Sequence, residues 1–159
     1  MHQKTTSTEE MDRLINLYSG GQVENALDEI EKLIKIYPKD PLLMNISGAC
    51  FNALKKYESA IQSYKLAISL KPDFIDALFN LGNLLRETGD LNNSVNYFKQ
   101  ILTLMPSHDA AQLNLGICFQ ELGNFNDAID HYEKAKQINP ENADICLLYT
   151  SDAADEEDS

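Results

Sequence analysis

A 34-residue period runs through most of this chain, and four evenly spaced prolines mark it most clearly. Pro38, Pro72, Pro106 and Pro140 follow one another at this spacing without insertion or deletion. Each closes a stretch in which apolar residues recur at helical intervals, and proline cannot continue a helix. The period therefore predicts a tandem array of short helical units, because a single globular core gives no reason for one spacing to persist through four copies.

Each copy divides into two amphipathic helices, as residues 75–106 illustrate. Leu78, Leu81 and Leu85 form the apolar stripe of a first helix. Gly89 interrupts the stripe and can adopt the left-handed conformation that ends a helix. A second apolar stripe follows and runs to the closing proline. A helical hairpin of this size cannot bury both of its faces alone, so it needs neighbouring copies.

The aligned copies share columns of similar size and polarity. A tight-packing column holds Leu14, Gly48, Gly82 and Gly116; a large apolar column holds Leu17, Phe51, Leu85 and Phe119; a second-helix column holds Ile30, Tyr64, Phe98 and Tyr132. Small residues let paired helices approach closely, and bulky ones fill the space between pairs. The pattern predicts eight helices near residues 8–19, 23–37, 41–54, 57–70, 75–88, 91–104, 109–122 and 125–138. The first copy is more polar, with Arg13 in a column that is otherwise small or apolar, as expected where one face of an array meets water.

These columns and this period resemble the tetratricopeptide repeat (TPR) family, a 34-residue helix–turn–helix repeat. The resemblance covers residues 7–142 and implies repeats at 7–40, 41–74, 75–108 and 109–142. It implies an all-α fold, a right-handed α-solenoid whose concave surface is lined by the first helix of each repeat. Residues 1–6 are expected to be a disordered N-terminus.

Charge and composition exclude several classes of function. The formal net charge is −12, and no clustered basic face is visible in the sequence, so no nucleic-acid partner is expected. The polar N-terminus lacks a signal peptide, and no apolar run approaches the length of a membrane span. The expected location is cytoplasmic, with no membrane partner.

No arrangement of catalytic, cofactor-binding or metal-ligating residues appears. Cys50, Cys118 and Cys146 lack metal or redox spacing, and the first two occupy a small, packed column. His131 is expected on the exposed side of a second helix, away from other histidines. The sequence contains no phosphate-binding glycine loop or zinc-protease motif. We therefore expect no cofactor or metal and no enzyme activity in the chain as it stands.

The resemblance places candidate peptide-binding residues on the concave face. These are Asn45, Asn52, Phe79, Asn80, Asn83, Arg86, Asn114 and Gln120. The set is rich in carboxamides, which can both donate to and accept from an extended peptide backbone. Asn80 and Asn114 are one repeat apart, which resembles part of the asparagine ladder of O-linked N-acetylglucosamine transferases. The alternative is a solvated polar helix face. A family mode that captures acidic tails with several basic residues is not expected, since Arg86 alone is available.

Two functions follow as hypotheses. The first is a protein–protein interaction scaffold that binds an extended peptide or a partner helix in its groove. The second is an N-terminal substrate-docking module of a larger enzyme, because similar arrays precede glycosyltransferase, sulfotransferase and oxygenase domains.

The end of the sequence departs from the repeat pattern. A fifth repeat starts on schedule at residues 143–145, but its packing columns never arrive. Residues 146–156, CLLYTSDAADE, resemble the translation in one frame of an adaptor used in transposase-based sequencing libraries. We therefore expect residues 146–159 to be a non-native tail, and the natural protein to continue past Ile145. The alternative is a short acidic terminus.

A truncation there would affect the fourth repeat. Its second helix, with Ile129, Tyr132 and Ile138, would lack the cover that a following repeat supplies. The chain is then expected to self-associate or fray through this exposed C-terminal repeat.

Overall fold

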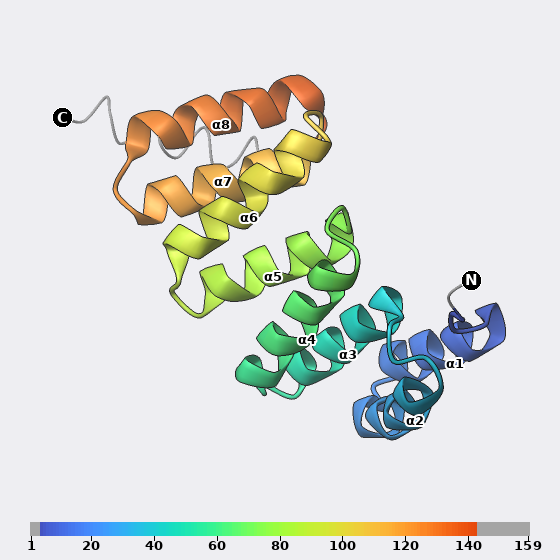
Figure 1. Ribbon diagram of the computed structural model, residues 1–159. Helices are drawn as coiled ribbons and strands as arrows, with labels where there is room; N and C mark the ends of the chain where they lie inside the picture. Colours follow the sequence, from blue (N-terminus) through green and yellow to red (C-terminus); the bar gives the residue numbers. More distant parts are fainter. Residues whose placement is uncertain (1–3, 143–159) are drawn as a thin grey trace. The chain divides into compact units, whose positions relative to one another are not determined.

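The computed structural model describes residues 4–142, and these residues form eight α-helices and no strand (Figure 1). The helices are α1 Thr8–Ser19, α2 Val23–Ile36, α3 Pro41–Ala53, α4 Tyr57–Leu70, α5 Ile75–Glu87, α6 Leu91–Leu104, α7 Asp109–Glu121 and α8 Phe125–Ile138. Every helix begins where the repeat pattern predicts and ends within one residue of it. The all-helical fold of paired helices is confirmed.

The described residues form two compact units, unit 1 up to Leu84 and unit 2 from Leu85 onward, and the division falls inside α5. In unit 1, α1 packs on α2, α2 on α3 and α3 on α4, so that α3 lies between α2 and α4 (Figure 1). In unit 2, α7 packs on both α6 and α8. In both units a first helix is thus enclosed by two second helices. The expected disorder of residues 1–6 does not hold at Thr6, whose amide and hydroxyl donate to the Asp40 carboxylate. Residues 1–3, the start of the fifth repeat at 143–145 and the tail at 146–159 lie outside the described residues.

Local side-chain caps explain where several helices begin. Ser7 and Glu10 form a capping box at α1: the Ser7 hydroxyl accepts from the Glu10 amide, and the Glu10 carboxylate accepts from the Ser7 amide. Asp40 caps α3 by accepting from the Leu42 and Leu43 amides, and Pro41 occupies the first helical position. These interactions satisfy amides that have no partner inside the helix.

The turn inside each repeat needs a residue with positive φ. Gly21, Gly89 and Gly123 adopt φ values of 76°, 88° and 79°, as expected for Gly89 from the sequence. The second repeat has Lys55 in this column, at φ 58°. Lys55 therefore has a left-handed backbone conformation, which is less favourable for a residue with a Cβ than for glycine.

In the tight-packing column, glycine leaves room for a tyrosine ring from the second helix of the same repeat. A Cβ added to Gly48 would lie 2.5 Å from the Tyr64 ring, and one added to Gly116 would overlap the Tyr132 ring. Tyr64 and Tyr132 are both almost fully buried. The prediction that these glycines mark close contacts is confirmed. The expectation that Tyr132 lacks cover was wrong, because α7 of its own repeat encloses it; Ile138, in contrast, is 38% exposed.

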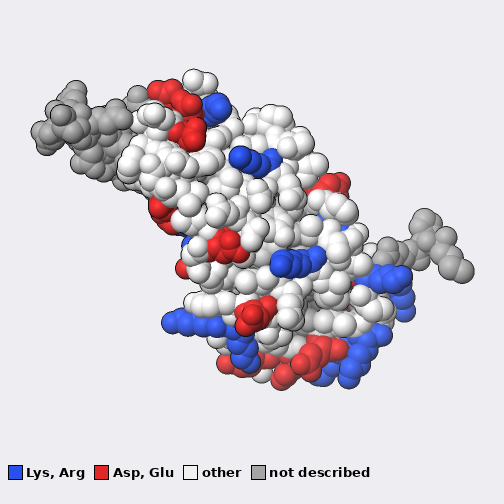
Figure 2. Space-filling model, turned by 60° about the vertical axis from the view of Figure 1, so that its left-hand side comes forward, with Lys and Arg blue, Asp and Glu red and all other residues white. Residues whose placement is uncertain are grey.

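Charged side chains do not form one large patch on the visible surface. Figure 2 shows acidic and basic groups scattered among uncharged residues on the face it draws. Within the described residues, no helix is long and apolar enough to cross a membrane.

Candidate functional site

Two carboxamides are in contact on the side of unit 1 that is formed by α3 and α5, the first helices of their repeats; this side is called the first-helix side below. Asn80 of α5 donates from Nδ2 to Oδ1 of Asn45 of α3 over 3.2 Å. Asn45 is 8% exposed and Asn80 is half-buried. The bond uses one donor of Asn80 and one acceptor of Asn45, so the pair keeps further donors and an acceptor for a ligand. Sequence reasoning selected both residues, but it did not predict that they would pair.

Three other candidates share these helices. Asn52 lies two turns after Asn45 in α3, and Phe79 and Asn83 flank Asn80 in α5. All three side chains are half-buried. Helical spacing places Asn83 one turn beyond Asn80 on the same side of α5. Unit 1 therefore holds five of the eight candidates on two helices, with amides, a ring and little charge.

Unit 2 holds the remaining candidates, and each is bound within the protein. Arg86 forms an ion pair with Glu121 at 3.4 Å. Gln120 accepts from the Tyr132 hydroxyl over 2.6 Å. Asn114 donates from Nδ2 to the Ala110 carbonyl of its own helix over 2.8 Å.

The ladder expected from Asn80 and Asn114 stays a prediction. Asn80 belongs to unit 1 and Asn114 to unit 2. The carboxamide contact that the structure does contain joins Asn80 to Asn45, which stands one residue before the earlier rung position in its repeat.

Unit 1 also has a cleft on its second-helix side, which is the side formed by α2 and α4, the second helices of their repeats. It is a cleft of about 420 Å³ between α2 and α4, with α3 as its floor. The lining is mainly apolar and includes Leu27, Ile34, Met44, Phe51 and Leu66. Sequence reasoning missed this cleft because it treated second helices as packing elements.

The corresponding position in unit 2 is filled by an aromatic stack. The His131 ring lies on the Phe119 ring at a centroid distance of 5.4 Å and an angle of 9°. His131 Nδ1 is 2.7 Å from Oε1 of Gln112, and the Lys99 ammonium is 5.7 Å from the Phe119 centroid. The expectation that His131 is exposed was wrong: it is half-buried between α7 and α8. Burial is the main cause that lowers its pKa, and the nearby Lys134 adds to it.

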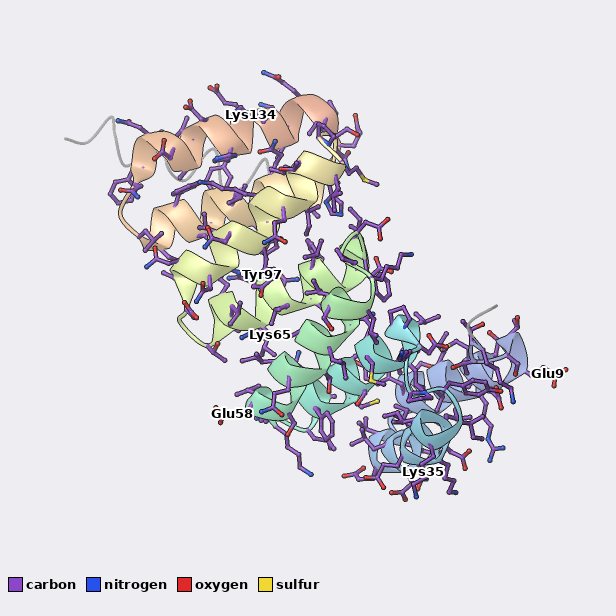
Figure 3. The ribbon with its side chains drawn as sticks, viewed as in Figure 1. Glu9, Lys35, Glu58, Lys65, Tyr97 and Lys134 are labelled. Carbon is purple, nitrogen blue, oxygen red and sulfur yellow. The ribbon has the colours of Figure 1, made fainter. Side chains whose placement is uncertain are left out.

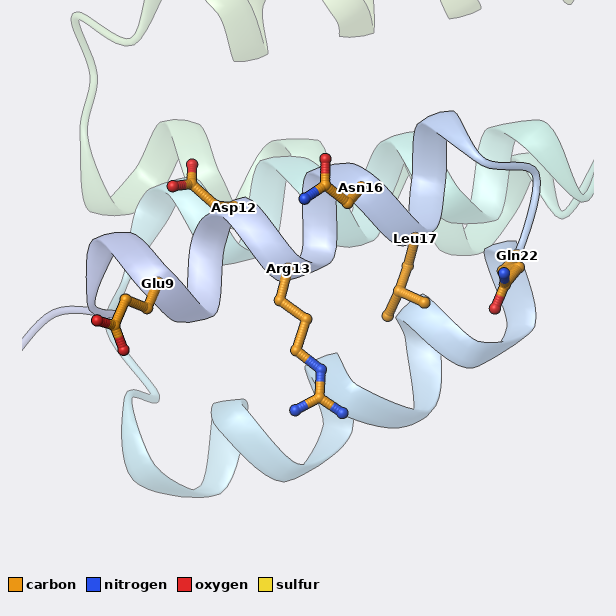
Figure 4. Close-up of a pocket in the computed structure, with 6 residues that line it drawn as sticks. All are labelled: Glu9, Asp12, Arg13, Asn16, Leu17 and Gln22. Carbon is orange, nitrogen blue, oxygen red and sulfur yellow. The ribbon is translucent and has the colours of Figure 1, made fainter.

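A polar pocket lies in the first repeat, at α1 and the turn that follows it. It has a volume of about 540 Å³ and is lined by Glu9, Asp12, Arg13, Asn16, Leu17 and Gln22 (Figure 4). The Arg13 side chain is 68% exposed and pairs with Glu29 of α2 at 3.4 Å. The predicted polar outer face of the first repeat is therefore confirmed.

The described cysteines are buried and their thiols are hard to ionise. Burial raises the pKa of Cys50 to about 11 and also raises that of Cys118, whose Sγ lies 3.4 Å from the Ser94 hydroxyl. Across residues 4–142, no group of three or more His, Cys, Asp or Glu side chains could hold a metal ion.

Comparison with known families matches most of the array. Models described as tetratricopeptide repeat match residues 75–108 and 110–142, and one described as TPR repeat matches residues 48–89.

Two relatives cover part of the chain. The peroxisomal targeting signal receptor of Saccharomyces cerevisiae is 30% identical over 80 residues, which is 50% of this chain and 13% of that protein. A probable UDP-N-acetylglucosamine–peptide N-acetylglucosaminyltransferase SEC of Arabidopsis thaliana is 35% identical over 84 residues, which is 51% of this chain and 8% of that protein. The matched segment thus spans only 8–13% of these relatives.

Solved structures match the fold more completely. MamA from Desulfovibrio magneticus RS-1 has a TM-score of 0.85 at 17% identity, covering 94% of this chain and 84% of that one. Pseudomonas aeruginosa pilF has a TM-score of 0.87 at 18% identity, covering 94% and 68%. At these identities the likeness concerns the fold alone. The repeat columns, the paired helices and the family matches over residues 48–142 lead to one conclusion: the chain belongs to the tetratricopeptide repeat family.

Proposed function

We propose that this chain is a protein-interaction module that binds an extended peptide along the first-helix side of unit 1. The observation that carries the proposal is the Asn80–Asn45 contact, which fixes two carboxamides from neighbouring repeats against each other. Fixed carboxamides lose little side-chain entropy on binding and can bond to both the N–H and the C=O of a peptide backbone. Asn52, Phe79 and Asn83 extend this surface along the same helices.

TPR domains generally bind proteins or peptides, and the relatives agree with that chemistry. One is named as a receptor for a targeting signal and another as an enzyme acting on peptide. Backbone recognition by neutral amides should tolerate many peptide sequences and respond weakly to salt.

The test is a peptide selected from an immobilised library and titrated by calorimetry. Asn80→Ala should weaken binding roughly 2- to 10-fold, because each lost hydrogen bond contributes about 0.5–1.5 kcal/mol. Asn96→Ala, an exposed asparagine on α6, is the matched control and should leave the affinity unchanged. N-methylation of single peptide amides should also weaken binding at specific positions. Equal binding by Asn80→Ala and Asn96→Ala would refute the carboxamide site.

A second candidate is a substrate-docking module of a larger enzyme. The match to the Arabidopsis thaliana peptide N-acetylglucosaminyltransferase favours it over the sulfotransferase and oxygenase alternatives. The reading frame after the Ile145 codon in source DNA distinguishes a separate module from the front of an enzyme. A glycosyltransferase domain encoded there would support docking, and a stop codon would exclude it.

A further inference from the structure

The cleft between α2 and α4 is a vacancy in a position that unit 2 fills with its own side chains. Its floor is formed by the half-buried ring of Phe51, with Met44 4% and Ser47 5% exposed. The two flanking second helices also carry exposed side chains outside the cleft, such as Lys35 of α2 and Lys65 of α4, both labelled in Figure 3. Leu66, which lines the cleft, is 45% exposed, so the cleft is open to solvent and accessible to a partner.

The repeat period identifies the matching residues two repeats apart. Phe51 corresponds to Phe119, and Ser63 of α4 corresponds to His131 of α8. In unit 2 the imidazole of His131 covers the Phe119 ring in a near-parallel stack. In unit 1 the serine side chain is too short to cover Phe51, and the cleft of about 420 Å³ remains.

Charge differs at the same position. Lys99 approaches the aromatic stack from α6 in unit 2, at 5.7 Å from the Phe119 centroid. The matching residue in α2 is Glu31, an exposed acid that lines the cleft. An aromatic surface rimmed by a carboxylate attracts a ring that is accompanied by positive charge, rather than a second acid.

We propose that this cleft binds a protein partner that inserts a planar aromatic side chain with a basic residue beside it. The inserted ring lies on Phe51, as His131 lies on Phe119, and the basic group pairs with Glu31. Met44 and Ile34 supply apolar contact around the ring. This site is on the second-helix side, so it is separate from the carboxamide surface and goes beyond the peptide-binding function.

The chain contains no tryptophan, so a tryptophan probe gives a fluorescence signal without background. The probes are the dipeptides acetyl-Trp-Lys-amide and acetyl-Trp-Glu-amide, titrated with the full chain at pH 7.5. The lysine probe should show a blue-shifted emission and bind roughly two- to fivefold more tightly than the glutamate probe, as expected for one exposed ion pair.

Four variants connect the signal to the cleft. Ser63→His should fill the vacancy and lower the affinity at least tenfold, whereas Ser63→Ala should keep it. Glu31→Lys should reverse the preference between the two probes. Asp28→Asn removes a charge one turn earlier in α2, outside the cleft lining, and should leave the preference for the lysine probe unchanged.

Three results would overturn the proposal. They are equal binding by the wild type and Ser63→His, no probe binding at millimolar concentration, and a concentration-dependent dimer that Ser63→His abolishes. The last result would mean that a second copy of the chain occupies the cleft. Circular dichroism confirms folding of each variant, and Glu31→Lys keeps the test decisive if Ser63→His misfolds.

Discussion

Thr6 and Asp40 are joined twice through one carboxylate oxygen. The Thr6 amide and hydroxyl donate to Oδ2 of Asp40 over 2.7 and 2.6 Å. The other oxygen, Oδ1, accepts from the Leu42 and Leu43 amides at the start of α3. Asp40 is 4% exposed, so these bonds form largely out of water. One side chain therefore both begins α3 and ties the segment before α1 to the second repeat.

Replacing Asp40 should destabilise unit 1 strongly. Asp40→Ala removes a helix cap and leaves buried donors without acceptors, at a cost of about 1–3 kcal/mol in the free energy of unfolding. Asp40→Asn keeps an acceptor for the cap and should lose less. Urea denaturation measures both, with Asp28→Asn at an exposed position of α2 as the control. A loss for Asp40→Ala no larger than for the control would contradict this role.

Gly48→Ala tests the contact with Tyr64. Alanine favours a helix over glycine by about 1 kcal/mol, which alone would stabilise α3. The added Cβ would lie 2.5 Å from the Tyr64 ring, and overpacking costs about 1–3 kcal/mol. We expect a net loss in the free energy of unfolding. Adding Tyr64→Leu should remove the clash, so the double variant should show strong non-additivity; simple additivity would argue against the contact.

Lys55→Gly should stabilise the protein. A left-handed conformation costs a residue with a Cβ about 1–2 kcal/mol, whereas glycine adds about 0.4–1 kcal/mol of entropy to the unfolded chain. The first effect exceeds the second, so a net gain of about 0.5–1 kcal/mol is expected at Lys55, whose φ is 58°. Lys65→Gly, at an exposed position inside α4, should destabilise instead by about 1 kcal/mol, because glycine has a low helix propensity. If both glycine variants changed the melting temperature in the same direction, the strain at Lys55 would be refuted.

His131 should make unit 2 less stable in mild acid. Its pKa in the folded protein is lowered by burial and by Lys134, so the unfolded chain binds the proton more tightly. Stability is therefore fully present above the unfolded pKa of about 6.5 and falls as the pH drops through that value toward the folded pKa. Thermal unfolding between pH 7.5 and 5.5 measures this. His131→Gln should flatten the dependence, and an unchanged slope would show that other groups cause it.

The repeat register was predictable because it is set by residues that recur. Proline, glycine and apolar columns act on the backbone locally, and they placed every helix to within one residue. Side-chain pairing was less accessible. The Asn80–Asn45 bond joins residues that are not in the same column, and the His131 stack depends on the sizes of residues in three different columns. A repeat period shows which residue type recurs in each column, but it does not show which side chains from different columns are in contact.

Helix α3 faces both surfaces of unit 1 with adjacent residues. Asn45 bonds to Asn80 on the first-helix side, while Met44 lines the cleft between α2 and α4. Occupants of the two sides share no atoms, yet both would press on the same 13-residue helix. If one occupant displaced α3 and thereby changed the affinity of the other, thermodynamic reciprocity would require the second to change the affinity of the first by the same factor. Helix α3 separates the two surfaces and is also the element through which heterotropic coupling between them would act.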